Sequence, residues 1–148
     1  MPAQATMIPQ QQLIAAAKAP LLAFNDKNWT AAKAAITGNF VYDEVATKRK
    51  VQGADKAIAL WQGWAKAFPD SRATIHGAVA SGETVVLELT WHGTHNGPLE
   101  TPNGPIPATG KRIEVRACCV MEIAGEKAKL QRHYFDMATL LQQIGVGG

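Results

Sequence analysis

Hydrophobic residues early in the chain recur every three or four positions, the spacing of one face of a helix. They are Leu13, Ile14, Ala17, Leu21 and Phe24. Pro9 suits the first turn of such a helix, and Pro20 can kink it. Asn28 can cap a short second helix that ends at Gly38 and Asn39. The pattern therefore predicts two successive N-terminal helices.

The clearest helical pattern follows a brief strand at 40–44 and a loop at 46–52. The loop carries Lys48, Arg49 and Lys50, and we expect a solvated loop there rather than a phosphate contact. The helix covers 54–68 and is stopped by Pro69. Its apolar positions are Ile58, Leu60, Trp61, Trp64, Ala65 and Phe68.

Two tryptophans, Trp61 and Trp64, lie on adjacent turns of this helix. They either pack in the core or line a pocket for a flat apolar ligand, because an indole offers a large apolar surface with one polar N–H. The pattern leaves both interpretations open.

After Pro69 the period changes from helical to alternating, which is typical of strands. Segments 72–80 and 84–95 predict one hairpin, and segments 111–123 and 127–136 predict another, around Gly125. A short helix at 137–144 ends at Gly145. Helices followed by antiparallel strands indicate an α+β fold in which helices cover one face of a curved sheet.

The connection between the two hairpins, 96–110, contains four prolines and three glycines. A connection of this length without structure is usually functional or disordered. We expect it to be a lid.

Alternation along the strands predicts which side chains face inward. On the second strand the inward set is Val85, Leu87, Leu89, Trp91, Gly93 and His95. On the third it is Ile113, Val115, Ala117, Cys119, Met121 and Ile123. On the last strand Leu130 shares its parity with Arg132, Tyr134 and Asp136, so an inward Leu130 predicts an inward Asp136.

A carboxylate beneath the two tryptophans would be desolvated, and desolvation raises a carboxyl pKa toward the range of a general acid or base. Asp136 is therefore a candidate catalytic residue. The alternative is that Asp136 only caps the final helix. His95 is the last residue of the inward-facing apolar set on the second strand, just before the lid. It could polarise a carbonyl or relay a proton, or it could have only a structural role.

Composition limits the number of domains and the kinds of partner that the chain can have. A chain of 148 residues with 47% hydrophobic residues is one ordinary domain, which we place at 9–148 behind a flexible tail at 1–8. The net charge of +3 is weak evidence for nucleic acid, and no segment is apolar enough for a membrane span. Cys118 and Cys119 are adjacent, which suits neither a disulfide nor a metal site and favours a reducing, cytoplasmic location.

Motifs for nucleotide, metal and serine-nucleophile chemistry are absent from the sequence. We therefore expect no cofactor and no metal.

Four motifs in order give the chain a family resemblance. They are Phe68-Pro69-Asp70, Gly93-Thr94-His95 with Gly97, Thr109-Gly110-Lys111, and Tyr134-Phe135-Asp136 leading into Leu140 to Gly145. From about residue 21 to residue 145 the sequence resembles the SnoaL-like polyketide cyclases, of the nuclear-transport-factor-like superfamily that also holds ketosteroid isomerases and limonene epoxide hydrolases.

The resemblance implies a cone-shaped α+β barrel with a deep apolar pocket, and a homodimer formed through the outer face of the sheet. It also implies a reaction without metal or cofactor, in which an acid at the position of Asp136 removes an α-proton and the resulting enolate closes a ring by aldol addition. His95 matches a recurrent family histidine. The connection at 96–110 is longer than is usual in the family, and Arg132 stands where an acidic residue is common.

Together these observations predict a cyclase or isomerase acting on a small apolar carbonyl compound. Asp136 would be the general acid/base, and His95 would polarise or orient the substrate. The substrate-binding candidates are Trp61, Trp64, Trp91, Tyr134 and Arg132. Two alternatives stay open, namely a protein that only binds a hydrophobic ligand and an epoxide hydrolase of the same fold.

Overall fold

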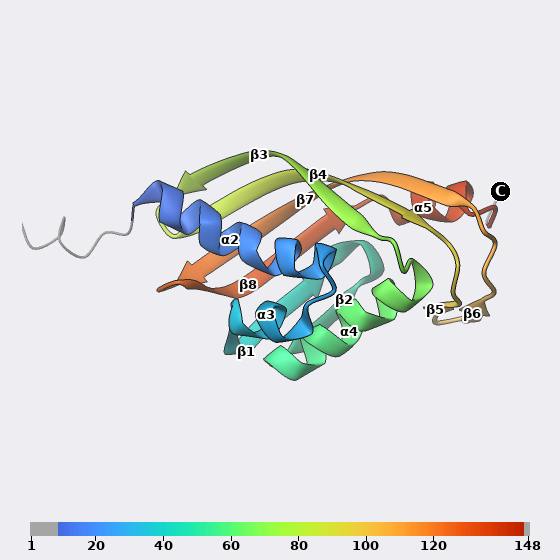
Figure 1. Cartoon of the computed structure of the whole chain (residues 1–148), viewed down its shortest axis with the longest axis horizontal. Coiled ribbons are helices and arrows are strands. Elements are labelled where there is room, and N and C mark those ends of the chain that lie inside the picture. Colours follow the sequence, from blue (N-terminus) through green and yellow to red (C-terminus); the bar gives the residue numbers. More distant parts are fainter. Residues whose placement is uncertain (1–8, 147–148) are drawn as a thin grey trace, which may run out of the picture.

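A curved six-stranded sheet forms one wall of the molecule, and three helices lie against its inner side (Figure 1). The computed structural model describes residues 9–146, so the tail expected at 1–8 lies outside the described residues. The helices are α2 (Gln10–Asn25), α3 (Trp29–Ala34), the 3₁₀ turn η1 (Val45–Thr47), α4 (Ala54–Ala67) and α5 (Met137–Gln143). The strands are β1 (Ile36–Glu44), β2 (Arg49–Gln52), β3 (Arg72–Ser81), β4 (Thr84–Thr94), β5 (Leu99–Thr101), β6 (Gly104–Ile106), β7 (Arg112–Ala124) and β8 (Lys127–Phe135).

Local sequence signals set the helix boundaries. The carbonyl of Pro9 accepts the first backbone hydrogen bonds of α2, and the side chain of Asn28 caps α3 by accepting from Ala31 at 3.0 Å. Both expected helices are confirmed. Helix α3 ends at Ala34, earlier than expected, because β1 already begins at Ile36.

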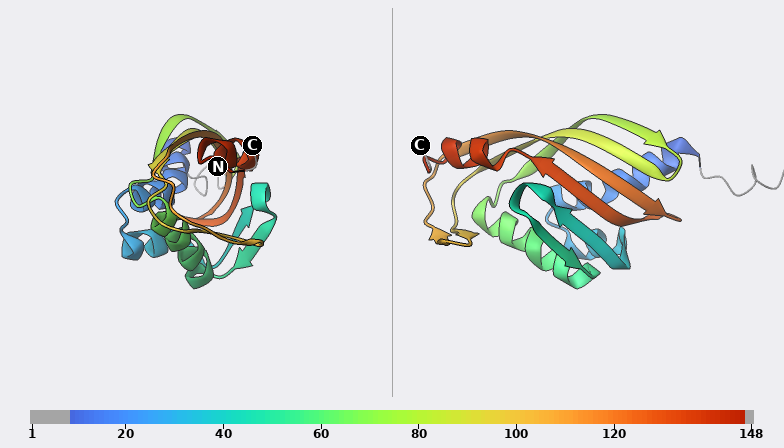
Figure 2. Two further views of the ribbon diagram at one scale, coloured as in Figure 1. Left: turned by 90° about the vertical axis from the view of Figure 1, so that its right-hand side faces the viewer. Right: turned by 180° about the vertical axis from the view of Figure 1, so that it is seen from behind.

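The sheet has the order β2-β1-β8-β7-β4-β3, with β1 parallel to β8 and the other pairs antiparallel. Both predicted hairpins are present, and the α+β prediction is confirmed. Viewed along the long axis, the strands curve around the helices (Figure 2). Segment 46–52 forms the end of η1 and the edge strand β2, so the expected loop is wrong, but Lys48, Arg49 and Lys50 are exposed to solvent as expected.

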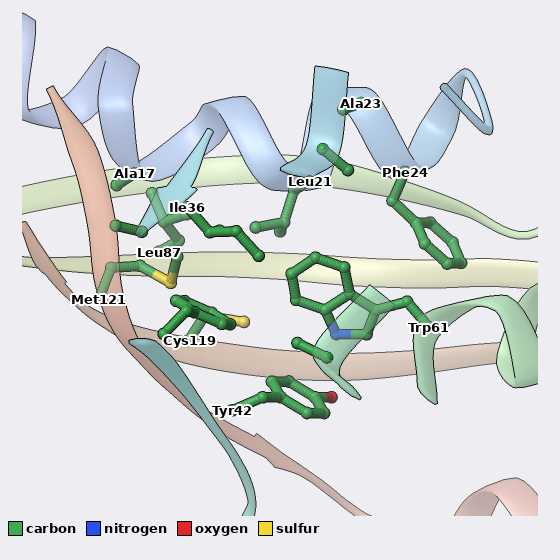
Figure 3. Close-up of a cluster of buried hydrophobic side chains, with 14 of the residues drawn as sticks. Ala17, Leu21, Ala23, Phe24, Ile36, Tyr42, Trp61, Leu87, Cys119 and Met121 are labelled. Atoms are coloured by element: carbon green, nitrogen blue, oxygen red, sulfur yellow. The ribbon is translucent and has the colours of Figure 1, made fainter. Parts of the chain in front are cut away.

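The inward faces of β4 and β7 are as expected. Val85, Leu87 and Leu89 on β4 are buried, as are Cys119 and Met121 on β7. These side chains meet α2 and α4 in a cluster in which Leu21, Phe24 and Trp61 face the strands (Figure 3). The hydrophobic core therefore lies between the helices and the concave face of the sheet.

Strand β8 departs from simple alternation. In its pairing with β7, Glu122 lies opposite Leu130 while Ile123 lies opposite Ala128, so Lys129 is an extra residue in β8. A bulge of this kind turns every later side chain to the other face. Gln131 and His133 are consequently buried, and the prediction that Leu130, Arg132, Tyr134 and Asp136 share the inward face is wrong.

The expected lid is ordered within the described residues. Its strands β5 and β6 form a small separate hairpin beside the end of α4 (Figure 1). The amides of Asn96 and Gly97 both donate to the carbonyl of Ala67, at 3.1 Å each. The segment is therefore fixed to the end of α4 at its base. None of the helices within residues 9–146 combines the length and apolar character needed to cross a membrane.

Candidate active site

An apolar cavity lies between the helices and the sheet. The empty space of about 690 Å³ includes the opening to solvent, and the enclosed part is much smaller. Its lining comes from α2, α4, α5, β1, β4, β7 and β8, together with the link between α4 and β3. The lining residues are Pro20, Leu21, Phe24, Tyr42, Trp61, Trp64, Phe68, Ser71, Trp91, Ile113, Val115, Gln131, His133, Phe135 and Leu140. A site with this lining favours a ligand that is mainly hydrophobic.

Three tryptophans expected at the pocket do line it. Trp61 and Trp64 reach it from α4, and Trp91 reaches it from β4. Their rings are held edge-on by neighbours: Trp91 lies 5.3 Å from the ring centre of Phe24, and Trp61 lies 5.6 Å from that of Tyr42. Such packing fixes the indoles, so the wall is largely preformed. That they bind substrate stays a prediction.

The polar part of the cavity wall centres on His133. Its Nε2 accepts a hydrogen bond from the indole Nε1–H of Trp91 at 3.1 Å, and its Nδ1 lies 2.8 Å from the hydroxyl of Tyr42. An indole N–H can only donate, so Nε2 is the unprotonated nitrogen and Nδ1 carries the proton. His133 therefore donates to Tyr42, and the hydroxyl of Tyr42 donates to the carboxylate of Glu44 at 2.9 Å.

Glu44 is a fully buried carboxylate with several donors. Its Oε2 also accepts from the indole of Trp64 at 2.8 Å, and its Oε1 accepts from Thr47 and from the guanidinium of Arg49 at 2.7 Å. Burial by itself would raise the pKa of Glu44, but the hydrogen bond from Thr47 and the charge of Arg49 outweigh it, and the pKa is lowered. Glu44 is therefore an anion behind the cavity wall.

The electrostatics keep His133 neutral. Its burial lowers the pKa to about 4, although the negative charge of Glu44 opposes that shift. Burial raises the pKa of Tyr42 well above its usual range, with the Glu44 charge adding to the effect. At neutral pH the chain of contacts thus comprises a neutral imidazole, a neutral phenol and a carboxylate.

Asp136 does not face this cavity, so its predicted orientation is wrong. It is exposed, and it caps α5 by accepting from the amide of Thr139 at 3.2 Å and from the Thr139 hydroxyl at 2.8 Å. The pKa of Asp136 is lowered mainly by the hydrogen bond from the Thr139 hydroxyl, and next by the hydrogen bond from the Thr139 amide. The extra residue in β8 is the physical reason, and the geometry gives the proposed catalytic role of Asp136 no support.

Two further candidates lie outside the cavity for the same reason. Tyr134 is 42% exposed on the outer face, and Arg132 pairs there with Glu122 at 3.4 Å. Their expected inward positions are wrong.

His95 is buried, as expected, but it does not belong to the cavity lining. Its Nδ1 accepts from the Thr109 amide at 3.2 Å, and its ring packs on Phe68 at 5.3 Å between ring centres. Burial lowers its pKa. His95 thus ties the two ends of the lid together, and the structure does not bring it to His133.

The structure brings together Tyr42, Glu44 and His133. Sequence reasoning missed Tyr42 and Glu44, and it gave His133 no catalytic role because its parity on the last strand is opposite to that of Asp136. A usable signal existed on β1, because Phe40, Tyr42 and Glu44 share one parity, which places the carboxylate on the buried face. Within residues 9–146 no group of three or more His, Cys, Asp or Glu side chains is arranged to hold a metal ion.

Solved structures of other proteins share this architecture. A candidate SnoaL-like polyketide cyclase from Jannaschia sp. CCS1 is 19% identical, with a TM-score of 0.76 over 93% of this chain and 94% of that one. IdmH from Streptomyces antibioticus, a candidate polyketide cyclase, is 22% identical, with a TM-score of 0.77 over 91% and 99%. An LEH-like epoxide hydrolase from M. tuberculosis is 22% identical, with a TM-score of 0.70 over 90% of each chain. These similarities show the fold.

A search of curated proteins finds no match to the chain. The family model described as "SnoaL-like polyketide cyclase" matches residues 15–144, which is nearly the whole chain. The curved sheet, the covering helices and the buried cavity agree with that match, and the chain belongs to the SnoaL-like polyketide cyclase family.

Proposed function

We propose that the protein is a cofactor-independent enzyme of cyclase or isomerase type that removes an activated α-proton from an apolar carbonyl compound, with His133 as the general base. The observation that carries the proposal is the pair formed by His133 and Trp91. An unprotonated Nε2 and an indole N–H donor lie 3.1 Å apart at a mostly apolar cavity. Proton abstraction next to a carbonyl needs one base and one donor for the developing oxyanion.

In the proposed reaction the substrate carbonyl accepts the hydrogen bond of Trp91 in place of His133. The lone pair on Nε2 is then free to take the α-proton, and the electrons of the C–H bond move into the enolate, whose oxygen keeps the indole donor. A base with a pKa of about 4 has the strength of a carboxylate and is fully deprotonated at pH 7.

The chain behind His133 offsets the charge that the reaction creates. Once Nε2 is protonated, the imidazolium donates from Nδ1 to Tyr42, and Tyr42 donates to the anionic Glu44. Glu44 favours the charged form of His133, and its own hydrogen bonds to Arg49 and Trp64 hold it in place. In a cyclase the enolate carbon then attacks a second carbonyl and His133 returns the proton to the new alkoxide. In an isomerase the proton returns to another carbon.

A binding protein is the second candidate, because both ring nitrogens of His133 already have partners in the protein. Such a network could serve only to shape a ligand site. The same cavity would then hold an apolar compound without changing it.

Proton exchange separates the two candidates. We suggest 2-tetralone as the probe, since it is an apolar ketone with activated α-protons, and 2-naphthol as a planar mimic of its enolate. An enzyme should exchange the α-protons for deuterium in D₂O with saturable kinetics, measured by NMR, and 2-naphthol should inhibit competitively. Binding of 2-naphthol with no exchange above the buffer rate would support the binding protein and refute the proposed enzyme.

A further inference from the structure

Two side chains at the cavity each carry a buried polar atom without a hydrogen-bond partner in the described part of the chain. Gln131 is 3% exposed and Ser71 is 7% exposed, and both line the cavity. The Oε1 of Gln131 and the Oγ of Ser71 have no hydrogen-bond partner among residues 9–146. A buried polar atom without a partner destabilises a fold, so its presence at a ligand cavity calls for a reason beyond stability.

Gln131 is held by one end of its amide. Its Nε2 donates to the sulfur of Cys119 at 3.3 Å, which leaves the other end of the amide unused. On β8 it stands two residues before His133, on the same face, and it lies opposite Tyr42 on β1. Gln131 is therefore the next inward position beyond the proposed base.

Ser71 is fixed by its backbone, between α4 and β3. Its amide donates to the carbonyl of Phe68 at 2.9 Å, and its own carbonyl accepts from the ammonium of Lys27. Among residues 9–146 only its hydroxyl has no partner. A Cβ on Gly93 would lie 3.4 Å from the Cα of Ser71, so Ser71 is level with the end of β4.

The pairing of β4, β7 and β8 gives the order of these groups along the cavity. Gln131 is level with Val85, and His133 is level with Leu87. Trp91 follows two inward positions later, and Gly93, beside Ser71, comes after it. Gln131 and Ser71 thus lie at opposite ends, with His133 and the Trp91 indole between them.

We propose that Gln131 and Ser71 are the specificity-determining polar residues of this cavity, and that its ligand is an elongated apolar compound with an oxygen function at each end. A hydroxyl suits Gln131, because it can pair with either end of a carboxamide, and a hydroxyl or carbonyl oxygen suits Ser71. The reacting carbonyl lies between them. The inference rests on the proposed function for the position of that carbonyl, but not for the two end contacts.

Binding of non-reacting probes tests the end contacts. We suggest 4-hydroxystilbene and 4,4′-dihydroxystilbene, which differ by one terminal hydroxyl, with affinities measured by calorimetry. The wild-type protein should prefer the diol by about tenfold, the ratio expected from one good hydrogen bond to a buried partner. Gln131→Leu and Ser71→Ala should each reduce that preference to about twofold or less.

Thr37→Val is the matched control. The Thr37 hydroxyl is also buried and unpartnered among the described residues, but it lies outside the cavity lining. This variant should retain the tenfold preference. Gln131→Leu should also melt no lower than the wild-type protein, because it removes an unsatisfied polar group. If it fails to fold, Gln131→Met provides the same test.

Three results would overturn the inference: equal affinity of the wild-type protein for both probes, a full preference for the diol in both variants, or a loss of preference in Thr37→Val. A Gln131→Leu variant that melts lower and keeps the preference would assign Gln131 to structure alone. Because these probes do not react, a missing exchange activity with an intact preference would refute the proposed enzyme and leave the end contacts standing.

Discussion

Acid should destabilise the protein through His133 in particular. The imidazole is buried and neutral, with Nε2 accepting from Trp91, and its pKa is about 4 in the folded state. In the unfolded chain a histidine has a pKa near 6.5. Between pH 6.5 and pH 4 His133 is protonated in the unfolded state but stays neutral in the folded state. Stability from this group is therefore complete above pH 6.5 and is lost as the pH falls toward 4.

The size of the effect follows from the gap between those two pKa values. The free energy of unfolding should fall by about 3 kcal/mol in total once the pH is below 4. Roughly 2 kcal/mol of this decrease should occur between pH 7 and pH 4.5. Urea unfolding at both pH values measures the change. His133→Gln cannot titrate, so its free energy of unfolding should fall by roughly 2 kcal/mol less over the same interval.

His92→Gln is the matched control, because His92 is a partly exposed histidine on the opposite face of β4, beside Glu114. The buried His133 is still present in this variant, so the loss of stability assigned to His133 should remain. If His133→Gln loses as much stability as the wild-type protein between pH 7 and pH 4.5, then His133 is not held neutral by burial and the proposed base is refuted.

Three other substitutions have defined outcomes. Trp91→Phe removes the oxyanion donor and keeps a six-membered aromatic ring, so the maximal exchange rate should fall about 100-fold. The affinity for 2-naphthol should also fall, because its oxygen takes the place of the enolate oxygen; an unchanged exchange rate would contradict the donor role. Glu44→Gln should lower the free energy of unfolding in urea by about 2–3 kcal/mol. This is less than the loss expected for a fully buried ion pair, because Arg49 is partly exposed. An unchanged free energy of unfolding would argue against the buried carboxylate. Gly97→Ala places a Cβ against the carbonyl of Lys66 and should lower the melting temperature by about 5 °C or more, whereas Gly63→Ala in open space on α4 should not; equal effects would refute the close approach.

Much of the fold was predictable because its signals are local. The capping residue Asn28 and the unbroken alternation on β4 and β7 each act over a few positions, and the structure agrees with them. The same reasoning failed on β8 because of one extra residue, Lys129. A bulge depends on how two strands pair, so the alternation of one strand alone cannot predict it.

The candidate site was harder to predict because its contacts join distant segments. The Glu44 carboxylate receives hydrogen bonds from Arg49, five residues away, and from Trp64 on α4. His133 meets Tyr42 and Trp91 from two other strands. The tryptophans and the inward parity of Glu44 could be read from the sequence, but only the folded chain shows which polar groups share one cavity.

In the proposed mechanism His133, and not Asp136, transfers the proton. The direct test compares α-proton exchange of 2-tetralone in the variants His133→Gln and Asp136→Asn, both checked for folding. Asparagine is also a good N-cap, so the second variant keeps the start of α5. We predict that His133→Gln loses at least about 100-fold in exchange rate while Asp136→Asn keeps the wild-type rate. The reverse pattern, with activity lost in Asp136→Asn and retained in His133→Gln, would contradict the account.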